Sequence, residues 1–353
     1  MDPILVTSTE EATGKTAVSL ALAKRALAAD LSVGYMKPKG TRLQSATGKT
    51  RDEDPMLARE LLDLDAEMHE LEPIVYTPTF VEEAIRGMEN PADLRERVLE
   101  NYEQLAEGRD LMILEGTDHL STGGVVELTD RDIAEATDAR VVLLSRYDEP
   151  GDIDDVLAAA DHLGDNLAGV LFNAVPDTVF DQLTTDAVPF LENRGVPVLG
   201  VVPRVKELAG MTVGDLTERM GAELLTTDAN TDVFIERLIV GAMSGESALS
   251  YFRRTQNAAM ITGGDRSEMI TAALEASGIK CIILGGGFRP TGAVIGKAEE
   301  RGIPVLLVQS DTRNVIDRAE KALQSGPTRD SKTVDRMTEL LTDRTDIDDL
   351  LTE

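Results

Sequence analysis

Short apolar runs alternate with longer amphipathic stretches along residues 1–222. The first run is PILVT at residues 3–7, and it is followed by LSVGYMKP, LMILEG, RVVLLS, LAGVLFN and VPVLGVV. Between these runs, apolar residues recur at helical spacing, as in TAVSLALAKRALAAD. Unbroken runs of Val, Ile and Leu indicate strands that are covered on both faces, as in a parallel sheet between helices. The pattern therefore predicts a doubly wound α/β domain over residues 1–222.

A second, shorter series of the same kind follows a polar linker at residues 223–230. The runs AAMITGG, KCIILGGG and PVLLVQSDT each precede a helical stretch, which predicts a smaller α/β domain over residues 231–326. Before the linker, RVKELAGMTVGDLTERMGAELL is expected to be a helical segment that closes the first domain. Residues 327–353 are polar and acidic, so we expect an exposed helix or a frayed tail there.

The charge of the chain excludes two classes of partner. Its 35 Lys and Arg residues stand against 64 Asp and Glu residues, which gives a net charge of −29. Nucleic acid and anionic membrane surfaces attract clustered Lys and Arg, so neither is an expected partner. The acids are spread over every predicted helix, and only ten residues are Lys. We interpret this as adaptation to a saline solvent, as in a haloarchaeal protein; a surface for a basic partner is the alternative.

Cysteine usage and the first residues of the chain favour a cytoplasmic protein. Cys281 is the one cysteine, which excludes an intramolecular disulfide and an all-cysteine metal site. No apolar run approaches the roughly 20 residues that cross a bilayer. The opening MDPILVTST lacks the basic and apolar regions of a signal peptide.

The strongest chemical signal is STEEATGKT at residues 8–16, between the first predicted strand and the first predicted helix. A loop in this position points backbone N–H groups and a helix N-terminus at a phosphate group. In the pattern G-x-x-x-x-G-K-[ST], Lys15 reaches the β- and γ-phosphates and the Thr16 hydroxyl ligates Mg²⁺. Thr9 stands where the pattern has its first glycine. With ATP and Mg²⁺ as the expected cofactors, the predicted nucleotide-binding residues are Thr9, Glu10, Thr13, Gly14, Lys15, Thr16 and Ala17.

A second Gly-Lys-Thr at residues 48–50 lacks this context, because the apolar pattern predicts no strand before it. We therefore expect the second copy to be a chance match.

The phosphate-binding loop belongs to a larger set of residues that resembles a known family. The loop, Lys37-Pro38-Lys39, Asp52-Glu53-Asp54 and Leu114-Glu115-Gly116 occur in the order, and at roughly the spacing, of dethiobiotin synthetase. Ser-Thr-Glu followed by Gly-Lys-Thr-Ala more closely resembles the synthetase-like domain at the N-terminus of long phosphate acetyltransferases. The resemblance covers about residues 2–220.

This resemblance implies a role for each matching residue. Lys15 and Thr16 bind the phosphates and the metal, and Lys37 contacts the γ-phosphate or the acceptor, so Lys15 and Lys37 are the candidate catalytic residues. Asp54 and Glu115 join Thr16 on Mg²⁺, directly or through water. Each residue also has a purely structural interpretation: Glu115 as a cap, Asp54 as a surface acid, and Lys37 as a solvated strand end.

Three further features bear on the substrate. Asn173, at the end of GVLFN, lies where the resembling family places an Asn that reads adenine. His119 in GTDHLSTGG is either an acid or base near the γ-phosphate or a solvated loop residue. Residues 76–83, YTPTFVEE, stand where dethiobiotin synthetases carry a Pro-x-Ser-Pro-His-like segment for their diaminoacid, so synthesis of dethiobiotin itself is not expected.

The second predicted domain is similar to the DRTGG domain, a small α/β module that also mediates self-association in relatives. Its loops ITGGDRS and ILGGGFRPT each follow a strand and open a helix, with Ser267 and Gly285 where that family usually has Thr. The glycines either let a ligand approach the backbone or only tighten the turns. The candidate ligand-loop residues are Gly263, Gly264, Asp265, Arg266, Gly286, Gly287, Asp311 and Thr312.

Three functions compete. The first is a Mg-ATP-binding regulator, a homodimer, that acts on acetyl-CoA or acetate metabolism through a protein partner. The second is an ATP-dependent, carboxylate-activating ligase of the synthetase type. The third, a partitioning-type ATPase, is disfavoured because Glu10 stands where those proteins have an extra lysine. Acetyl transfer is not expected of these 353 residues alone, since that catalytic domain needs roughly 300 more.

Overall fold

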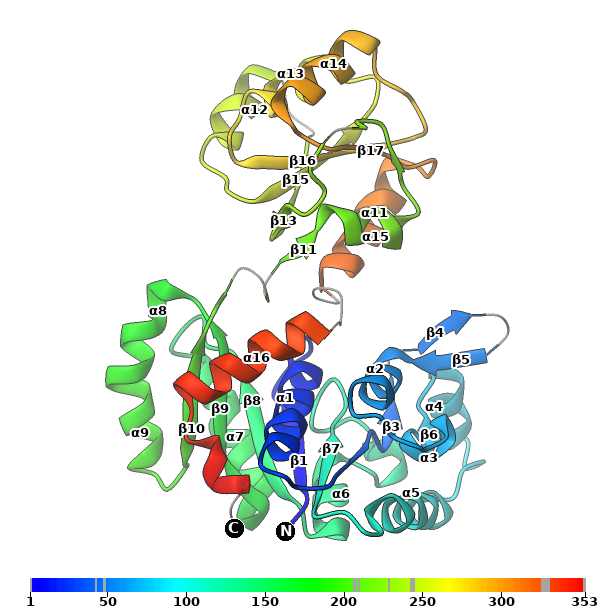
Figure 1. Ribbon diagram of the computed structural model, residues 1–353, viewed down its shortest axis with the longest axis vertical. Coiled ribbons are helices and arrows are strands. Elements are labelled where there is room, and N and C mark those ends of the chain that lie inside the picture. Colours follow the sequence, from blue (N-terminus) through cyan, green and yellow to red (C-terminus); the bar gives the residue numbers. More distant parts are fainter. Residues whose placement is uncertain are drawn as a thin grey trace. The chain divides into compact units, whose positions relative to one another are not determined.

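The computed structural model describes residues 2–41, 43–46, 49–205, 208, 210–227, 229–241, 245–324 and 331–351. The chain divides into two compact units, one of residues 1–204 with 329–353 and one of residues 205–328. Figure 1 shows that each unit is built from a sheet and the helices packed on it.

A six-stranded parallel sheet forms the centre of the described part of the first unit, with the strand order β10-β9-β8-β1-β7-β2. Its strands are β1 (Ile4–Ser8), β2 (Val33–Met36), β7 (Leu111–Glu115), β8 (Arg140–Ser145), β9 (Leu167–Val175) and β10 (Val198–Pro203). They coincide with the six apolar runs, so the predicted parallel sheet is confirmed. Because all the strands run the same way, the residues that follow them gather at one edge of the sheet.

Helices cover both faces of this sheet (Figure 1). Every residue of β1, β2 and β7 is buried, as the unbroken apolar runs predict. Leu5 packs in one cluster with side chains of α5, α6 and α7, and α1 contacts β1, β2 and β7 from the other face. The helices are α1 (Lys15–Ala28), α2 (Glu53–Leu61), α3 (Met68–Leu71), α4 (Pro78–Ile85), α5 (Pro91–Ala106), α6 (Asp130–Thr137), α7 (Asp152–Leu163), α8 (Asp177–Gln182) and α9 (Val188–Glu192). Short 3₁₀ or π turns lie at Gly124–Val126, Gly164–Asn166 and Leu183–Ala187.

The last helix, α16 (Ser331–Arg344), belongs to the first unit, and a 3₁₀ turn at Ile347–Leu351 follows it. The helix packs against α1 and β10, and its buried side chains are Val334, Met337, Leu340 and Leu341. The expectation of an exposed helix or frayed tail is therefore wrong for these residues. The many acids of this segment obscured apolar residues that recur at helical spacing. Those apolar residues are buried against the rest of the first unit.

The division between the units falls at residue 204, earlier than the expected end of the first domain at residue 222. The segment expected to close the first domain forms β11 (Met211–Thr212), α11 (Val213–Met220) and β12 (Glu223–Leu224) of the second unit. β11 pairs with β13 (Phe234–Ile235), and β12 pairs with β17 (Val305–Leu307), both antiparallel. The start of the expected linker is thus an edge strand.

Two residues of the second Gly-Lys-Thr lie in β5 (Lys49–Asp52), which pairs antiparallel with β4 (Leu43–Ala46). Gly48 is outside the described residues, whereas Lys49 and Thr50 belong to β5. The expectation that no strand precedes this copy is therefore wrong. The copy still lacks a phosphate-binding context, since it continues as a strand and offers no helix N-terminus. Nearby, β3 (Lys39–Gly40) pairs with β6 (Ile74–Val75).

The second unit is a smaller α/β fold, as predicted. Its five-stranded sheet has the order β12-β17-β16-β15-β14, and the strands from β17 to β14 are parallel. Buried clusters that contain Ile282 and Ile283, neighbours on β16, cover its two faces. The remaining elements are β14 (Arg237–Val240), β15 (Ala258–Gly263), β16 (Ile279–Gly285), α12 (Gly245–Phe252), α13 (Ser267–Leu274), α14 (Gly292–Arg301) and α15 (Thr312–Gln324).

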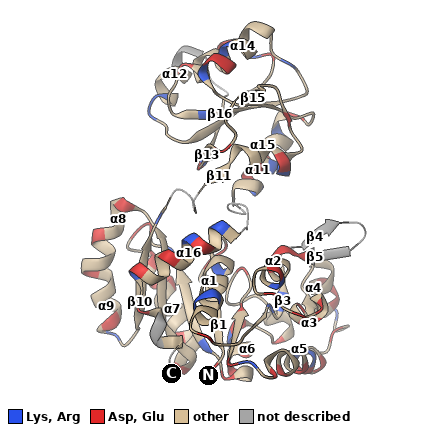
Figure 2. Cartoon of the chain, in the orientation of Figure 1, with Lys and Arg blue, Asp and Glu red and all other residues tan. Residues whose placement is uncertain are grey.

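Acidic side chains are spread over the outer helices rather than gathered in one patch (Figure 2). Among the residues that the structure describes, no helix combines the length and the apolar character needed to span a membrane. Cys281 is buried in β16, and burial raises the pKa of its thiol.

Candidate functional site

The loop between β1 and α1 has the backbone of an anion site. Gly14 caps α1 with a φ of 93°, a conformation that favours glycine, and a Cβ there would lie 2.7 Å from Nδ2 of Asn173. The first turn of α1 contains no acidic residue. The first N–H groups and the positive end of the helix dipole therefore face the loop, as in phosphate sites.

Contacts with the end of β8 hold this loop. The N–H of Thr9 donates to the carbonyl of Leu144 at 3.1 Å, and its hydroxyl donates to Oγ of Ser145 at 3.3 Å. Arg146 donates to the carbonyl of Ala12, whose φ is 54°. Ala12, not Thr9, is thus the non-glycine residue of the loop in the left-handed region, so threonine at the first glycine position needs no unusual backbone. Sequence analysis had not singled out Ala12, Ser145 or Arg146.

Glu10 lies on the exposed side of the loop. Partial desolvation raises the pKa of its carboxyl, and the charge of Arg146 opposes this shift. Thr13 is buried, and its Oγ1 has no hydrogen-bond partner among the described residues. Ala17 lies in the first turn of α1 and is half-buried.

Lys15 is buried and folds back over the loop. Its Nζ donates to Oγ of Ser8 at 2.6 Å and to the carbonyl of Asp118 at 3.3 Å. These partners keep the ammonium at the carboxyl edge of β1, beside the N-terminus of α1. Ser8 and Asp118 were not among the predicted site residues, although Ser8 opens the Ser-Thr-Glu motif that carried the resemblance.

Thr16 and Glu115 meet as predicted. The Thr16 hydroxyl donates to Oε1 of Glu115 at 2.8 Å, although the two residues are 99 positions apart. Tyr35 of β2 donates its hydroxyl to the other oxygen, Oε2, also at 2.8 Å. Burial, followed by the charge of Glu115, raises the pKa of Tyr35 well above its usual range, so Tyr35 stays a donor. The two bonds fix the orientation of the Glu115 carboxylate.

Lys37 follows β2 and lies among carboxylates. Its Nζ is 2.8 Å from Oδ2 of Asp52, forms an ion pair with Oδ2 of Asp54, and is 3.9 Å from Oε1 of Glu115. All four residues are at most 2% exposed. Asp52 caps α2 by accepting the N–H of Asp54 at 3.0 Å, which places both acids against Lys37. The interpretations of Lys37 as a solvated strand end and of Asp54 as a surface acid are therefore wrong.

A fourth acid, Glu72, joins this group. Its Oε2 accepts the N–H of Asp52 at 3.3 Å, while its Oε1 is buried and has no hydrogen-bond partner among the described residues. Burial and, next, the charge of Asp52 raise the pKa of Glu72 to about 7, and Lys37 opposes the shift. We call Asp52, Asp54, Glu72 and Glu115 the carboxylate cluster. The cluster contains four acids, but only one lysine of the described residues, Lys37, lies among them. The site is therefore strongly negative.

A buried ion pair between Lys39 and Asp130 lies near this edge of the sheet. Lys39 is paired with Oδ1 of Asp130 at 3.1 Å and also donates to the carbonyl of Leu128. The hydroxyl of Thr7 donates to Oδ2 of Asp130 at 2.6 Å. A Cβ on Gly116 would lie 2.3 Å from that oxygen, so glycine after Glu115 lets α6 approach β7 closely. Asp130 thus connects β1, through Thr7, with β3, through Lys39.

Asn173 and His119 lie at the same edge of the sheet. Asn173 is buried in β9 and donates from Nδ2 to the carbonyl of Thr13 at 2.7 Å. The exposed His119 has its Nδ1 2.8 Å from Oγ of Ser121. The structure places Asn173 against the phosphate-binding loop, and its adenine-reading role stays a prediction, while His119 makes the contacts of a solvated loop residue.

Oxygen donors of the type that Mg²⁺ prefers are present at the site. The Thr16 hydroxyl and the carboxylates of Asp54 and Glu115 are hard ligands. Among the described residues, however, no group of three or more His, Cys, Asp or Glu side chains is placed to hold a metal ion. Mg²⁺ at such sites is bound by one or two carboxylates together with waters and substrate phosphates, so the residues present fit a nucleotide-bound Mg²⁺.

The loops after β15, β16 and β17 in the second unit contact one another. A Cβ on Gly264 would lie 1.7 Å from the carbonyl of Phe288, and one on Gly287 would lie 2.6 Å from Oε1 of Gln309. The N–H of Gly286 donates to the carbonyl of Ser310 at 2.7 Å. These glycines therefore have a packing role, whatever ligand they meet.

The polar members of these loops are engaged as well. Asp311 accepts the N–H groups of Arg313 and Asn314 at the start of α15, and these bonds lower the pKa of its exposed carboxyl. Arg266 donates to the carbonyl of Gly241 at 3.2 Å. Asp265 is exposed, and Thr312 opens α15. Turn and cap contacts account for these groups, and a ligand role remains a prediction.

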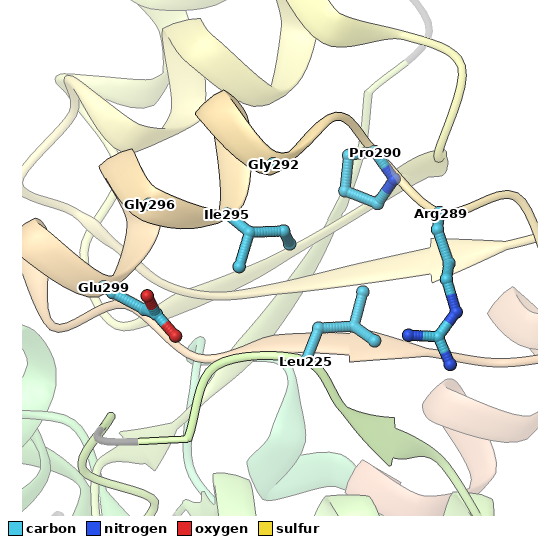
Figure 3. A pocket seen from close by; sticks show the side chains of 7 residues that line it. All are labelled: Leu225, Arg289, Pro290, Gly292, Ile295, Gly296 and Glu299. Atoms are coloured by element: carbon cyan, nitrogen blue, oxygen red, sulfur yellow. The ribbon is translucent and has the colours of Figure 1, made fainter.

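A pocket of about 300 Å³ lies beside α14, and Arg289 and Pro290 of the loop ILGGGFRPT line it, whereas none of the eight candidate ligand-loop residues does. Figure 3 shows Ile295 of α14 and Leu225 as its apolar side chains, with Arg289 toward one end and Glu299 toward the other. Arg289 is held by Glu223 through contacts of 2.5 and 2.6 Å. The remaining lining residues are Gly292 and Gly296.

The parallel sheet, the Gly14-Lys15-Thr16 turn and the acid at the end of β7 define a P-loop nucleotide-binding domain. Residues 2–212 match the family model described as AAA domain, and residues 215–322 match the model described as DRTGG domain. The chain belongs to the AAA domain family and has a dethiobiotin synthetase-like P-loop domain followed by a DRTGG domain.

Curated relatives match either both units of the chain or about as much of it as the first unit. The chain is 23% identical to the phosphate acetyltransferase of Pseudomonas putida, over 98% of this chain and 51% of the relative. It is 25% identical to the ATP-dependent dethiobiotin synthetase of Methanocaldococcus jannaschii, over 56% of this chain and 92% of the relative. The chain thus spans about half the length of the curated phosphate acetyltransferases that it matches.

Among solved structures, the CBS and DRTGG domains of the regulatory region of Clostridium perfringens pyrophosphatase match with 18% identity and a TM-score of 0.28. That match covers 40% of this chain and 69% of the other.

Proposed function

We propose that the first unit binds Mg-ATP and that the chain is a nucleotide-sensing regulatory protein linked to acetyl-CoA or acetate metabolism. The observation that carries the proposal is the 2.8 Å hydrogen bond from Thr16 to Glu115, beside Lys15, at the N-terminus of α1. A hydroxyl, a carboxylate and an ammonium at that place are the groups that a metal-bound triphosphate requires.

Each residue has a stated task in this proposal. Lys15 neutralises the β- and γ-phosphates, and the N–H groups of the loop and of α1 bind phosphate oxygens. Thr16, Asp54 and Glu115 hold Mg²⁺, which supplies positive charge to the phosphate oxygens when it is bound. Asn173 lies next to the loop and reads the adenine.

Homology supports the metabolic link. The chain matches about half of the phosphate acetyltransferases, over both of its units. We propose that it acts on acyl-CoA chemistry through a protein partner, in the cytoplasm. In this proposal the second unit binds a small ligand at its loops and mediates a homodimer, and the diffuse acidic surface keeps the protein soluble in high salt.

The alternative is an ATP-dependent ligase that activates a carboxylate. One specific observation favours it: the Lys37 ammonium is buried together with the carboxylates of Asp54 and Glu115. In that reaction an acceptor carboxylate oxygen attacks the γ-phosphorus, the bond to the bridging oxygen breaks, and ADP leaves. The product is an acyl phosphate, and Lys37 would stabilise the charge of the migrating group.

Equilibrium binding of ATP in molar KCl with Mg²⁺ tests the nucleotide site. Lys15→Ala should weaken binding at least about tenfold, because it removes a charge-assisted contact to phosphate. Lys24→Ala is the matched control, since Lys24 lies on the same helix and pairs with Asp335 of α16. Equal affinity in wild type and Lys15→Ala would refute the assignment.

Phosphate release separates the regulator from the ligase. The protein would be incubated with Mg-ATP and a panel of carboxylates and acyl-CoAs. Release stimulated by one carboxylate, and lost in Lys37→Ala, would establish the ligase. Tight ATP binding without stimulated release would favour the regulator.

A further inference from the structure

Lys37 contacts the same atoms that the proposed metal site needs. Its ammonium pairs with Oδ2 of Asp54 and lies 3.9 Å from Oε1 of Glu115. That Oε1 atom is also the one that accepts the Thr16 hydroxyl at 2.8 Å. Thr16, Asp54 and Glu115 are the three residues assigned to Mg²⁺, so a lysine of the chain already neutralises the two acids of that set.

The surrounding cluster carries more negative charge than Lys37 can balance. Glu72 is only 6% exposed, and its Oε1 has no hydrogen-bond partner among the described residues. Asp52 is fully buried and pairs with Lys37 at 2.8 Å. Buried carboxylates without a counter-ion are costly, which leaves the cluster able to accept more positive charge.

We propose that Lys37 is an internal counter-ion of the metal site, which holds Asp54 and Glu115 in the metal-free protein and leaves them when a divalent cation binds. This inference rests on the proposed function. In the metal-free protein the ammonium therefore takes the position of a cation beside both acids of the proposed metal site.

Asp52 keeps Lys37 in place during this exchange. Its Oδ1 accepts the N–H of Asp54, and its Oδ2 contacts Lys37, so it is anchored to α2 independently of the metal site. When Lys37 no longer contacts Asp54 and Glu115, its ammonium keeps Asp52 as a partner and needs a second anion. The terminal phosphate of a nucleotide supplies that anion. Metal and nucleotide should therefore bind cooperatively, each raising the affinity for the other by the same factor.

Manganese binding in the absence of nucleotide tests the exchange directly. Free Mn²⁺ would be measured by electron paramagnetic resonance with wild type, Lys37→Met, Lys37→Arg and Lys24→Met. Removing the competing charge should raise Mn²⁺ affinity about tenfold or more in Lys37→Met. Lys37→Arg keeps the charge and should match wild type, as should Lys24→Met. An unchanged affinity in folded Lys37→Met, or an equal gain in Lys24→Met, would overturn the proposal.

A measurement on the wild-type protein covers the case in which Lys37→Met fails to fold. Acylation of individual lysines would be followed by mass spectrometry with and without MnCl₂. Lys37 should be protected without metal and should react at least several-fold faster with it, while Lys24 keeps its rate. Equal Lys37 rates in the two conditions would overturn the exchange.

The two proposals fail in different ways. If wild type binds no ATP, the proposed function fails, whatever Mn²⁺ does. If ATP binds and Lys15→Ala abolishes it, but Lys37 neither competes with Mn²⁺ nor gains reactivity, only the counter-ion exchange fails.

Discussion

Tyr35 and Glu115 form a buried hydrogen bond between adjacent strands of the sheet. The Tyr35 hydroxyl donates to Oε2 of Glu115 at 2.8 Å, which leaves Oε1 to face Thr16 at the start of α1. β2 thus orients an acid of β7 toward the nucleotide site without itself approaching the phosphate-binding loop. Tyr35 acts through Glu115, so it is a positioning residue.

Tyr35→Phe should therefore affect the metal more than the nucleotide. A hydrogen bond to a charged group contributes about 1.5–3 kcal/mol, so ATP affinity with Mg²⁺ should fall by roughly tenfold or more. Affinity measured in EDTA should stay within about twofold, because Lys15 and the loop are untouched. Titration calorimetry in both conditions checks this.

Tyr102→Phe is the control, because Tyr102 is half-buried on α5, where it packs against the hydrophobic cluster of the first unit. It should leave both affinities unchanged. If Tyr35→Phe weakened binding equally with and without Mg²⁺, Glu115 would not act on the metal.

Glu72 should make stability depend on pH. Burial raises the pKa of its carboxyl from 4.5 to about 7, so the folded state favours the neutral acid. The stability that this gives is fully present below pH 4.5 and is lost as the pH rises through 7. Glu72→Gln mimics the neutral form, so the variant should be more stable than wild type at high pH. The difference between their free energies of unfolding should be about 1–2 kcal/mol larger at pH 8 than at pH 5.

Urea unfolding at the two pH values measures this difference. Glu60→Gln, at an exposed position of α2, should behave like wild type. A Glu72→Gln variant whose advantage is the same at pH 5 and pH 8 would show that Glu72 is already ionised in the fold.

Leu341→Ala should destabilise the first unit. Leu341 is fully buried on α16, and truncation of a buried leucine costs about 2–5 kcal/mol. Denaturant unfolding followed by circular dichroism measures the loss, and Asp343→Ala at an exposed position of the same helix should cost little. A loss under about 0.5 kcal/mol for Leu341→Ala would mean that α16 adds nothing to the core.

Gly14 and Ala12 offer a paired test of the loop backbone. Both residues have positive φ, 93° and 54°, and a Cβ added to Gly14 would also lie 2.7 Å from Nδ2 of Asn173. Gly14→Ala should lose more than about 1 kcal/mol and weaken ATP binding, because the new Cβ is both strained and too close to Asn173. Ala12→Gly should change stability by no more than about 1 kcal/mol, since relief of strain offsets the added chain entropy. Thermal unfolding and ATP titration of the two variants decide between these outcomes, and equal losses in both would contradict them.

The parallel sheet was predictable because each strand is a continuous apolar run. A strand of this kind must be buried on both faces, and a parallel sheet covered by helices provides that burial. The phosphate-binding loop was predictable because Gly14, Lys15 and Thr16 follow a strand and open a helix, although the contacts that hold the loop come from Leu144, Ser145, Arg146 and Asn173. The burial of helix α16 was missed, since its apolar stripe is diluted by acids. The expected boundary at residue 222 differs from the division at residue 204, because β11 and β12 are too short to show a strand pattern.

The sequence by itself determined the fold class and the turn in which Gly14, Lys15 and Thr16 are predicted to meet phosphate, because strand, turn and helix follow one another there. It also named Lys37, Asp54 and Glu115, but only as separate candidates. Tertiary structure alone decided that these three share a buried site with Asp52 and Glu72, and that Tyr35 orients Glu115. The physical reason is that a buried charge takes whichever partner the packing of distant elements brings to it, and no local pattern specifies that choice.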